Sequence, residues 1–196
     1  MKLLTPTSWS DYELIDTGGG EKLERFGKYI LCRPEPQAVW EKSMLEKEWD
    51  TMAHATFKRE KGGQKESDRG EWILKPGMPD QWYINYHWNG LNIKMRMGLT
   101  AFKHVGVFPE QAENWNFIYQ SILDSKIDKP MLLNLFAYTG GASLAGKAAG
   151  ADVVHVDSVK QVINWSAENQ EASGLTGIRW VVEDAMKYLR REVKRG

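Results

Sequence analysis

The chain has 196 residues, 42% of them hydrophobic, and its 26 basic and 26 acidic side chains give a formal net charge of zero. This length and composition fit a soluble globular protein with one medium domain or two small ones. No apolar run approaches the roughly 20 residues that span a bilayer, and residues 1–10 lack the apolar core of a signal peptide. We therefore expect a cytoplasmic protein without membrane contact.

The cysteine and histidine content argues against disulfide and metal chemistry. Cys32 is the single cysteine, and the four histidines do not occur at metal-ligand spacing, so we expect no metal site. Cys32 lies in a strand-like stretch without a catalytic signature. We interpret it as a packed side chain rather than a nucleophile.

The first 100 residues have the short period and the aromatic content of a small β-rich domain, which could contribute to substrate recognition. Three glycines from Gly18 to Gly20 indicate one hairpin turn, and Asn89-Gly90 indicates another. The predicted strands are residues 11–16, 23–33, 72–74, 82–86 and 91–97. We place the boundary to a second domain, residues 101–196, at about residue 100.

Nine tryptophans are more than average usage gives. Trp72 and Trp82 lie on predicted strands and are candidates for stacking on unpaired RNA bases, although aromatic packing is the alternative. Trp40 and Trp49 flank a helix-like segment, residues 41–48, and are expected in the core.

Residues 58–70 are charged and contain glycines, which indicates a solvent loop. Contact with RNA is an alternative, but acidic neighbours nearly cancel the basic side chains. The basic residues are Lys58, Arg59, Lys61, Lys65 and Arg69.

A helix is predicted before the second domain's first strand. Pro109 suits its first turn, and Ala112, Trp115, Ile118 and Ile122 recur at helical spacing.

Residues 131–136 are a short apolar run, which predicts a strand covered on both faces. Thr139-Gly140-Gly141 then turns the chain and lets a ligand approach the backbone. A helix over residues 142–149 follows, and its N-terminal amides favour a carboxylate or phosphate.

Two further strand–helix pairs follow. Residues 153–156 predict a strand that delivers Asp157 at its carboxyl end, where an acid can bind a ribose diol. Ser158 and Gln161 predict a capping box for the next helix. Residues 178–182 predict a third strand, followed by Asp184. In the last helix, the apolar residues Met186, Leu189 and Val193 share one face. The carboxyl ends of three such strands would converge on one crevice, an adenosine pocket.

The glycine turn contains no G-x-G-x-x-G, so the dinucleotide fingerprint is absent. The stretch Asn134-Leu-Phe-Ala-Tyr-Thr-Gly-Gly141 resembles motif I of the class I S-adenosylmethionine (SAM) methyltransferases, in the form found in the large-subunit ribosomal RNA methyltransferase branch. Residues 154–157 and 181–185 resemble two later motifs of that family, so the resemblance covers about residues 100–196. It implies a Rossmann-like α/β fold and SAM as cofactor.

The resemblance also implies roles for individual residues. The backbone of residues 134–141 would hold the methionine part of SAM, Asp157 the ribose hydroxyls, and Asp184 with the Ala185 amide the adenine. Asn134 stands where many family members have an acid, although this branch also uses Asn. The implied cofactor-binding residues are Gln111, Asn134, Phe136, Ala137, Tyr138, Thr139, Gly140, Gly141, Ser143, Asp157, Ser158, Asp184 and Ala185.

Residues 104–115 resemble the Gly-Phe-x-x-Asp-Gln segment that precedes the cofactor domain in the same branch. Gln111 matches, whereas Pro109 and Glu110 replace the usual residues. Phe108 and Gln111 are expected to line the cofactor or target-base pocket; a helix cap and a packed aromatic are the alternative.

The family places a further strand, ending in an Asp/Asn-Pro-Pro motif beside the methyl donor, after the third helix. This sequence contains no such motif. We therefore expect the N-terminal half of a longer SAM-binding unit, with residues 131–136 at a sheet edge, and we assign no catalytic residue.

These observations predict a SAM-dependent methyltransferase that modifies a base in RNA, ribosomal or other. The resemblance implies RNA, whereas the charge gives no support for it. The alternatives are a methyltransferase of a small molecule or protein, a non-catalytic RNA-binding or SAM-sensing module, and an NAD-type oxidoreductase.

Overall fold

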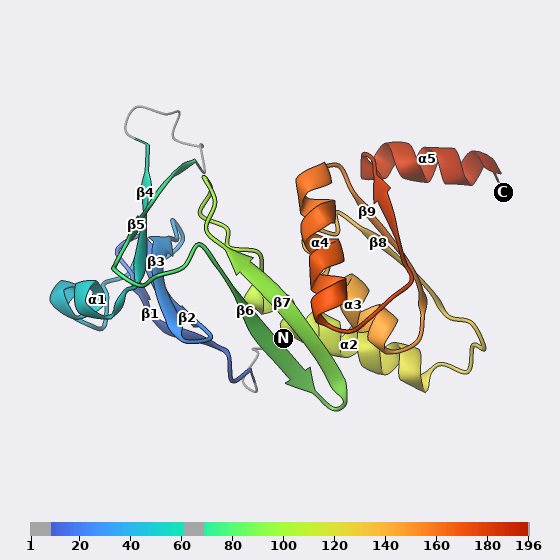
Figure 1. The fold of residues 1–196 in the computed structure, drawn as a ribbon, viewed down its shortest axis with the longest axis horizontal. Helices are drawn as coiled ribbons and strands as arrows, with labels where there is room; N and C mark the ends of the chain where they lie inside the picture. The colour runs from blue at the N-terminus through green and yellow to red at the C-terminus, as the bar shows by residue number, and fades with distance from the viewer. Residues whose placement is uncertain (1–8, 61–68, 196) are drawn as a thin grey trace. The chain divides into compact units, whose positions relative to one another are not determined.

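The computed structural model describes residues 9–60 and 69–195. Among these, two compact units separate by their contacts (Figure 1). The N-terminal unit contains residues 9–84 and 97–106, and the C-terminal unit contains residues 85–96 and 107–195. The hairpin of β6 (Gln81–Trp88) and β7 (Leu91–Gly98) gives residues to both units. The boundary expected at residue 100 stays a prediction.

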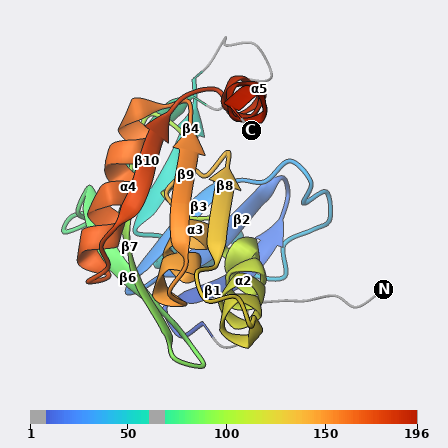
Figure 2. The same ribbon diagram turned by 90° about the vertical axis from the view of Figure 1, so that its right-hand side faces the viewer.

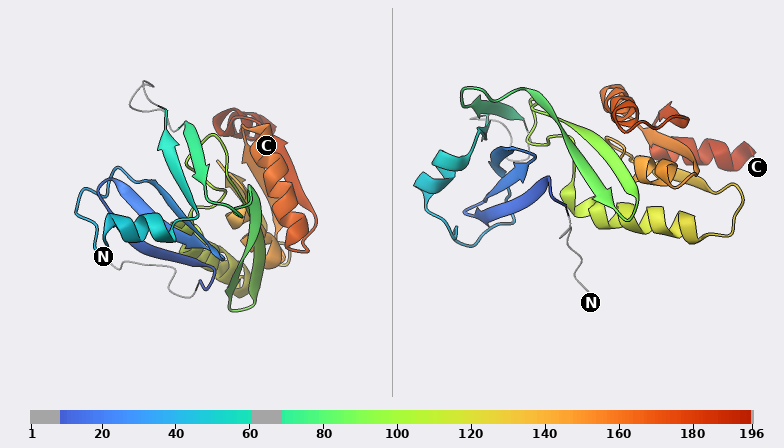
Figure 3. Two further views of the ribbon diagram at one scale, coloured as in Figure 1. Left: turned by 60° about the vertical axis from the view of Figure 1, so that its left-hand side comes forward. Right: turned by 60° about the horizontal axis from the view of Figure 1, so that its bottom comes forward.

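The N-terminal unit is built on a five-stranded sheet in the order β1-β2-β3-β4-β5. Its neighbouring strands are antiparallel except for β3 and β4, which are parallel and joined by helix α1 (Figure 3). The elements are β1 (Tyr12–Gly18), β2 (Glu21–Phe26), β3 (Tyr29–Pro34), α1 (Glu46–Met52), β4 (Ala55–Arg59) and β5 (Gly70–Leu74). A core cluster of Leu23, Cys32, Trp49 and Ala53 joins the helix to the sheet.

The sequence patterns located most of these strands, with two errors. The strand predicted over residues 23–33 is two strands, because Gly27 adopts a left-handed φ of 64° and turns the chain. Lys58 and Arg59 belong to β4 rather than to a solvent loop. The hairpin turn at Asn89-Gly90 is confirmed by φ values of 43° and 92°. Residues 61–68, and the RNA contact considered there, lie outside the described residues.

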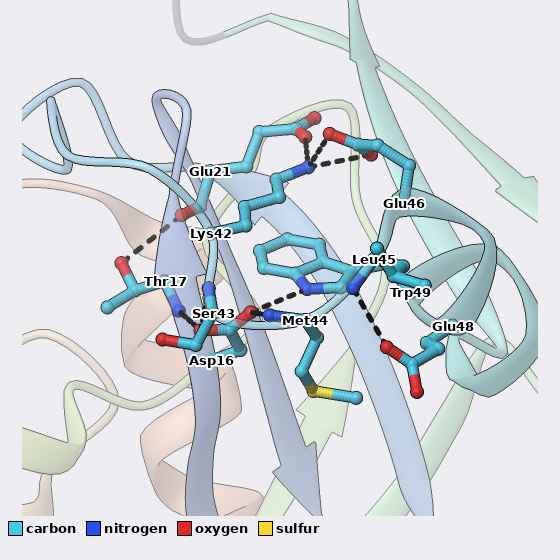
Figure 4. Close-up of polar contacts among 10 residues, drawn as sticks. All are labelled: Asp16, Thr17, Glu21, Lys42, Ser43, Met44, Leu45, Glu46, Glu48 and Trp49. Carbon is cyan, nitrogen blue, oxygen red and sulfur yellow. Dashed lines mark hydrogen bonds and ion pairs between the residues drawn. The ribbon is translucent and has the colours of Figure 1, made fainter.

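Buried Asp16 organises the junction between β1 and α1 (Figure 4). Its carboxylate accepts hydrogen bonds from the backbone N–H groups of Thr17, Ser43 and Met44 and from the Trp49 indole Nε1, at 2.9 to 3.3 Å. The Lys42 ammonium lies 3.9 Å from the centroid of the Trp49 ring. We call these contacts the Asp16 node.

The tryptophans divide differently from expectation. Trp49 is buried as predicted, but Trp40 is 54% exposed and donates its indole N–H to the Thr17 carbonyl. Trp82 is buried and donates to the Phe26 carbonyl, so it offers no stacking surface to RNA. Trp72 packs edge-on against a neighbouring phenyl ring in the same sheet. Cys32 is buried, and burial raises the pKa of its thiol to about 12, which confirms a packed side chain.

The C-terminal unit contains a parallel three-stranded sheet with β9 between β8 and β10 (Figure 2). Helices α3 and α4 lie on one face of this sheet and α5 on the other (Figure 1). The elements are a 3-10 turn (Pro109–Gln111), α2 (Ala112–Asp124), β8 (Met131–Leu135), α3 (Gly141–Ala148), β9 (Asp152–Asp157), α4 (Lys160–Ala172), β10 (Ile178–Val182) and α5 (Ala185–Arg195). No helix in the described ranges is long and apolar enough to cross a membrane.

The strand and helix order predicted here is correct, and β8 is an edge of the described sheet. Two details are wrong. β8 is not covered on both faces, since Met131 is 81% exposed. The capping box does not form, because Val159 caps α4 and donates its N–H to Asp157. On α5, Met186 and Val193 are exposed, and the helix buries Ala185 and Tyr188 instead.

Candidate functional site

A cleft of about 480 Å³ opens at the carboxyl end of β8, entirely within the C-terminal unit. One wall is the loop from β8 into α3, here called the cleft loop (residues 134–142). The opposite wall comes from β7, the 3-10 turn and the start of α2. Its residues are Met95, Val107, Phe108, Glu110, Gln111 and Trp115.

The cleft loop has an unusual backbone. Phe136, Tyr138 and Gly140 all adopt left-handed φ values, of 53°, 49° and 93°. Non-glycine residues rarely adopt this conformation, and each costs on the order of 1–3 kcal/mol. The Phe136 side chain is 72% exposed. The turn therefore presents main chain to the cleft at the point where β8 ends.

Gly141 lets α3 begin close to the opposite wall. A Cβ atom at this position would lie 2.5 Å from two carbon atoms of the Trp115 ring. Only glycine permits this approach without a shift of the ring. The first amides of a helix have no partner within the helix, so Gly141 and Ala142 offer hydrogen-bond donors to a carboxylate in the cleft.

Neighbouring elements hold the cleft loop in place from below. Tyr138 N donates to Asp157 Oδ2 at 3.0 Å, and Ala137 N donates to the Val156 carbonyl at 3.1 Å. From α4, Ser166 Oγ donates to the Tyr138 carbonyl at 2.6 Å, and Asn169 Nδ2 donates to the Thr139 carbonyl at 2.9 Å. The loop is thus fixed to the end of β9 and to α4.

A row of polar side chains runs beneath the loop from β8 to α4. It consists of Asn134, Ser143, His155 and Ser166, and we call it the polar row. Asn134 Nδ2 lies 2.9 Å from Ser143 Oγ, which lies 3.0 Å from His155 Nδ1, and His155 Nε2 lies 3.4 Å from Ser166 Oγ. Ser143, His155 and Ser166 are fully buried. Burial lowers the pKa of His155 to about 4, against a smaller opposing effect of Asp157, so the imidazole is neutral at pH 7.

Most of the residues implied by the resemblance come together around this cleft. Phe108, also expected at the pocket, lines it and packs on the Tyr138 ring at 5.0 Å between centroids. The implied residues that line the cleft are Gln111, Asn134, Phe136, Ala137, Tyr138, Thr139, Gly140 and Gly141.

The remaining implied residues do not line it. Ser143 is buried under the cleft loop, and Asp157 supports the loop through Tyr138 N. Ser158 is exposed beyond the end of β9. Asp184 is exposed and caps α5, whereas Ala185 is buried. A cofactor-binding role for any member of the set stays a prediction.

Sequence reasoning missed Met95, His155 and Ser166. The alternation of β9 could have placed His155 on an inward face, because Val153 shares that face. No sequence signal linked it to Ser166, which lies on the next helix, or linked Met95 of β7 to the cleft loop.

Comparison with known proteins gives the following relatives. No family model matches the chain. The ribosomal RNA large subunit methyltransferase K/L of Shewanella frigidimarina is 29% identical over 100 residues, which are 50% of this chain and 13% of that protein. The protein of the same name from Syntrophotalea carbinolica is 33% identical over 99 residues, 49% of this chain and 13% of that protein.

Solved structures align over nearly the whole chain. A SAM-dependent methyltransferase from Agrobacterium tumefaciens is 40% identical with a TM-score of 0.86, covering 100% of this chain and 60% of that one. A putative SAM-dependent methyltransferase from Streptococcus mutans is 18% identical with a TM-score of 0.68, covering 97% of this chain and 50% of that one.

These likenesses confirm the resemblance to SAM-dependent methyltransferases and the Rossmann-like α/β fold behind a β-rich region. The chain spans only 13% of the length of the curated relatives and 60% of the Agrobacterium structure.

Proposed function

We propose that this chain binds SAM in the cleft and serves methyl transfer to a base in RNA, specifically ribosomal RNA. The observation that carries the proposal is the cleft loop. Its residues 134–141 are the motif that resembles motif I, their main chain lines the cleft, and Asp157 supports it through Tyr138 N. The names of the curated relatives support ribosomal RNA as the acceptor. A cytoplasmic location goes with that substrate.

The residues present fit SAM. A cleft of about 480 Å³ falls within the usual range of ligand pockets. The main-chain wall lets the amino-acid part approach the backbone closely, and the start of α3 offers donors to its carboxylate. Each Asp157 oxygen accepts one backbone hydrogen bond and has another lone pair for a ribose hydroxyl.

SAM supplies a methyl group on an already activated sulfonium, so the protein's contribution is positioning and exclusion of water. The cleft loop would orient the cofactor, because β9 and α4 fix its backbone. The packed Phe108 and Tyr138 rings and the Trp115 ring provide apolar surface that keeps water from the bound cofactor. The net charge of zero gives no general attraction for phosphates, so RNA contact must be local.

The binding test is titration of SAM and, separately, of NAD into the chain by calorimetry. Asp157→Ala removes the predicted ribose acceptor together with the hydrogen bond that holds Tyr138 N, and it should weaken SAM binding about tenfold or more. Asp152→Ala is the matched control, because Asp152 is an exposed carboxylate at the opposite end of the same strand. A folded wild-type protein that binds NAD but not SAM, or neither, would overturn the proposal.

The acceptor test uses SAM with a radioactive methyl group and purified large-subunit ribosomal RNA. We expect label in the RNA fraction and none in transfer RNA or in added protein. Label in protein alone would replace RNA as the acceptor and leave the SAM site standing.

A further inference from the structure

The polar row has a single consistent direction of hydrogen bonding. Ser166 Oγ lies 2.6 Å from the Tyr138 carbonyl and 3.0 Å from the Val162 carbonyl, and both oxygens only accept. The Ser166 hydroxyl therefore donates its proton to one of these two carbonyl oxygens. Towards His155, Ser166 Oγ can only accept, so the imidazole Nε2 carries the proton.

This tautomer decides the rest of the row. A neutral imidazole has one N–H, so His155 Nδ1 is an acceptor and the Ser143 hydroxyl donates to it. Ser143 Oγ must then accept from Asn134, which places the Asn134 amide nitrogen toward Ser143. The two ends of an Asn amide are otherwise assigned only from such networks.

We infer that Ser143, His155 and Ser166 are positioning residues, which lock the Asn134 amide so that its Oδ1 presents an acceptor to the cleft. If SAM binds as in the proposed function, on which this step rests, Asn134 Oδ1 would accept a hydrogen bond from the ammonium group at the amino-acid end of SAM. A carboxylate at position 134 could accept through either of its oxygens. The Asn134 amide has one acceptor oxygen, so the neighbouring side chains must fix its orientation. The lowered pKa of His155 supports the assignment, because protonation of Nδ1 would leave the Ser143 hydroxyl without its acceptor.

The tautomer can be measured without any ligand. In protein labelled with ¹⁵N-histidine, two-bond correlation spectra distinguish a protonated from an unprotonated ring nitrogen, and His155→Gln assigns the signal among the four histidines. We expect protonated Nε2 and unprotonated Nδ1 at pH 7. Protonated Nδ1 alone, or a charged imidazolium, would overturn the inference.

The ligand arm compares SAM with methylthioadenosine, which has the adenosine and sulfur of SAM but no amino-acid end. Ser143→Ala frees the Asn134 amide and should weaken SAM binding about tenfold, while methylthioadenosine binding stays the same. Adding Asn134→Asp to Ser143→Ala should restore SAM binding, because a carboxylate accepts in either orientation. Ser121→Ala, at an exposed serine on α2 away from the cleft lining, is the control.

Three outcomes would contradict the inference. Equal losses for both ligands would mean that Ser143 acts through the shape of the loop. No loss for SAM would mean that the amide needs no partner. Failure of Asn134→Asp to restore SAM binding would exclude the oxygen as the acceptor. If the folded wild type binds neither ligand, the proposed function fails, while the tautomer measurement still decides the direction of the row.

Discussion

The two units each bury a polar network, and the networks are built in opposite ways. The Asp16 node places one carboxylate among four N–H donors, so a charge is surrounded by groups of the complementary kind. The polar row is neutral and directional, and it ends on Asn134 at the cleft. The Asp16 carboxylate uses its hydrogen bonds to hold the surrounding backbone in place. The polar row fixes the orientation of Asn134 and leaves its amide oxygen as an acceptor for a ligand.

Acid separates the two networks. Burial alone would raise the pKa of Asp16, but the hydrogen bonds from Met44, Trp49, Thr17 and Ser43 together hold it below its usual value. Its contribution to stability is present above the unfolded pKa of 3.8 and is lost as the pH falls through the folded pKa. His155 titrates at higher pH, with a folded pKa of about 4.

The largest effect is expected from Asp16→Ala. It leaves four N–H donors without their acceptor, and we expect the N-terminal unit to lose about 4 kcal/mol of unfolding free energy. Denaturant unfolding followed by tryptophan fluorescence measures the loss. Asp50→Ala, an exposed carboxylate on α1, should change little. A similar loss in both variants would mean that the node contributes nothing specific.

The second effect is the pH dependence of the C-terminal unit. Because the folded pKa of His155 lies below the unfolded value of 6.5, the unfolded chain binds the extra proton, and stability falls as the pH drops from 6.5 to about 4. Across this window the unfolding free energy should fall by about 3 kcal/mol. Hydrogen exchange of the β9 amides, corrected for intrinsic rates, measures it. His155→Gln should flatten the profile across this window, and an unchanged slope would exclude His155 as its source.

The third effect concerns the wall of the cleft. Gly141→Ala places a Cβ against the Trp115 ring and should cost about 2 kcal/mol through overpacking. Trp115→Phe removes the ring atoms in question, so the same Gly141→Ala change should cost less in that background. Thermal unfolding of the four proteins gives the coupling, and strict additivity would show that the two residues do not meet.

The smallest effect is expected from Lys42→Met. The change keeps the apolar stem but removes the cation above Trp49 and the ion pairs to Glu21 and Glu46, for about 1 kcal/mol. Lys47→Met, at an exposed position on α1, provides the comparison. A stability equal to that of the control would limit the Asp16 node to its hydrogen bonds.

The order of elements from β8 to α5 was predictable from sequence, because apolar runs, glycines and helical periods follow one another locally. The wrong predictions concern features that depend on contacts between residues far apart in the sequence or on where a helix begins. β4 pairs with β3 across α1, and the charges of Lys58 and Arg59 masked it. The capping box does not form because α4 has Val159, one residue later than Ser158, at its N-cap.

The candidate site was predictable where its residues are contiguous, in the cleft loop. The polar row was not, because Ser143, His155 and Ser166 lie on three elements that only the packing of α3 and α4 onto β9 brings together. Such hydrogen bonds leave no period in the sequence.

At the left-handed residues Phe136 and Tyr138, thermal stability and ligand binding place opposite demands on the choice of residue. Glycine at either position would relieve backbone strain, so a search for stabilising changes would select these positions early. Both residues line the cleft, and Tyr138 carries the contact with Phe108. Gains in thermal tolerance at these positions should therefore come with a loosened binding wall.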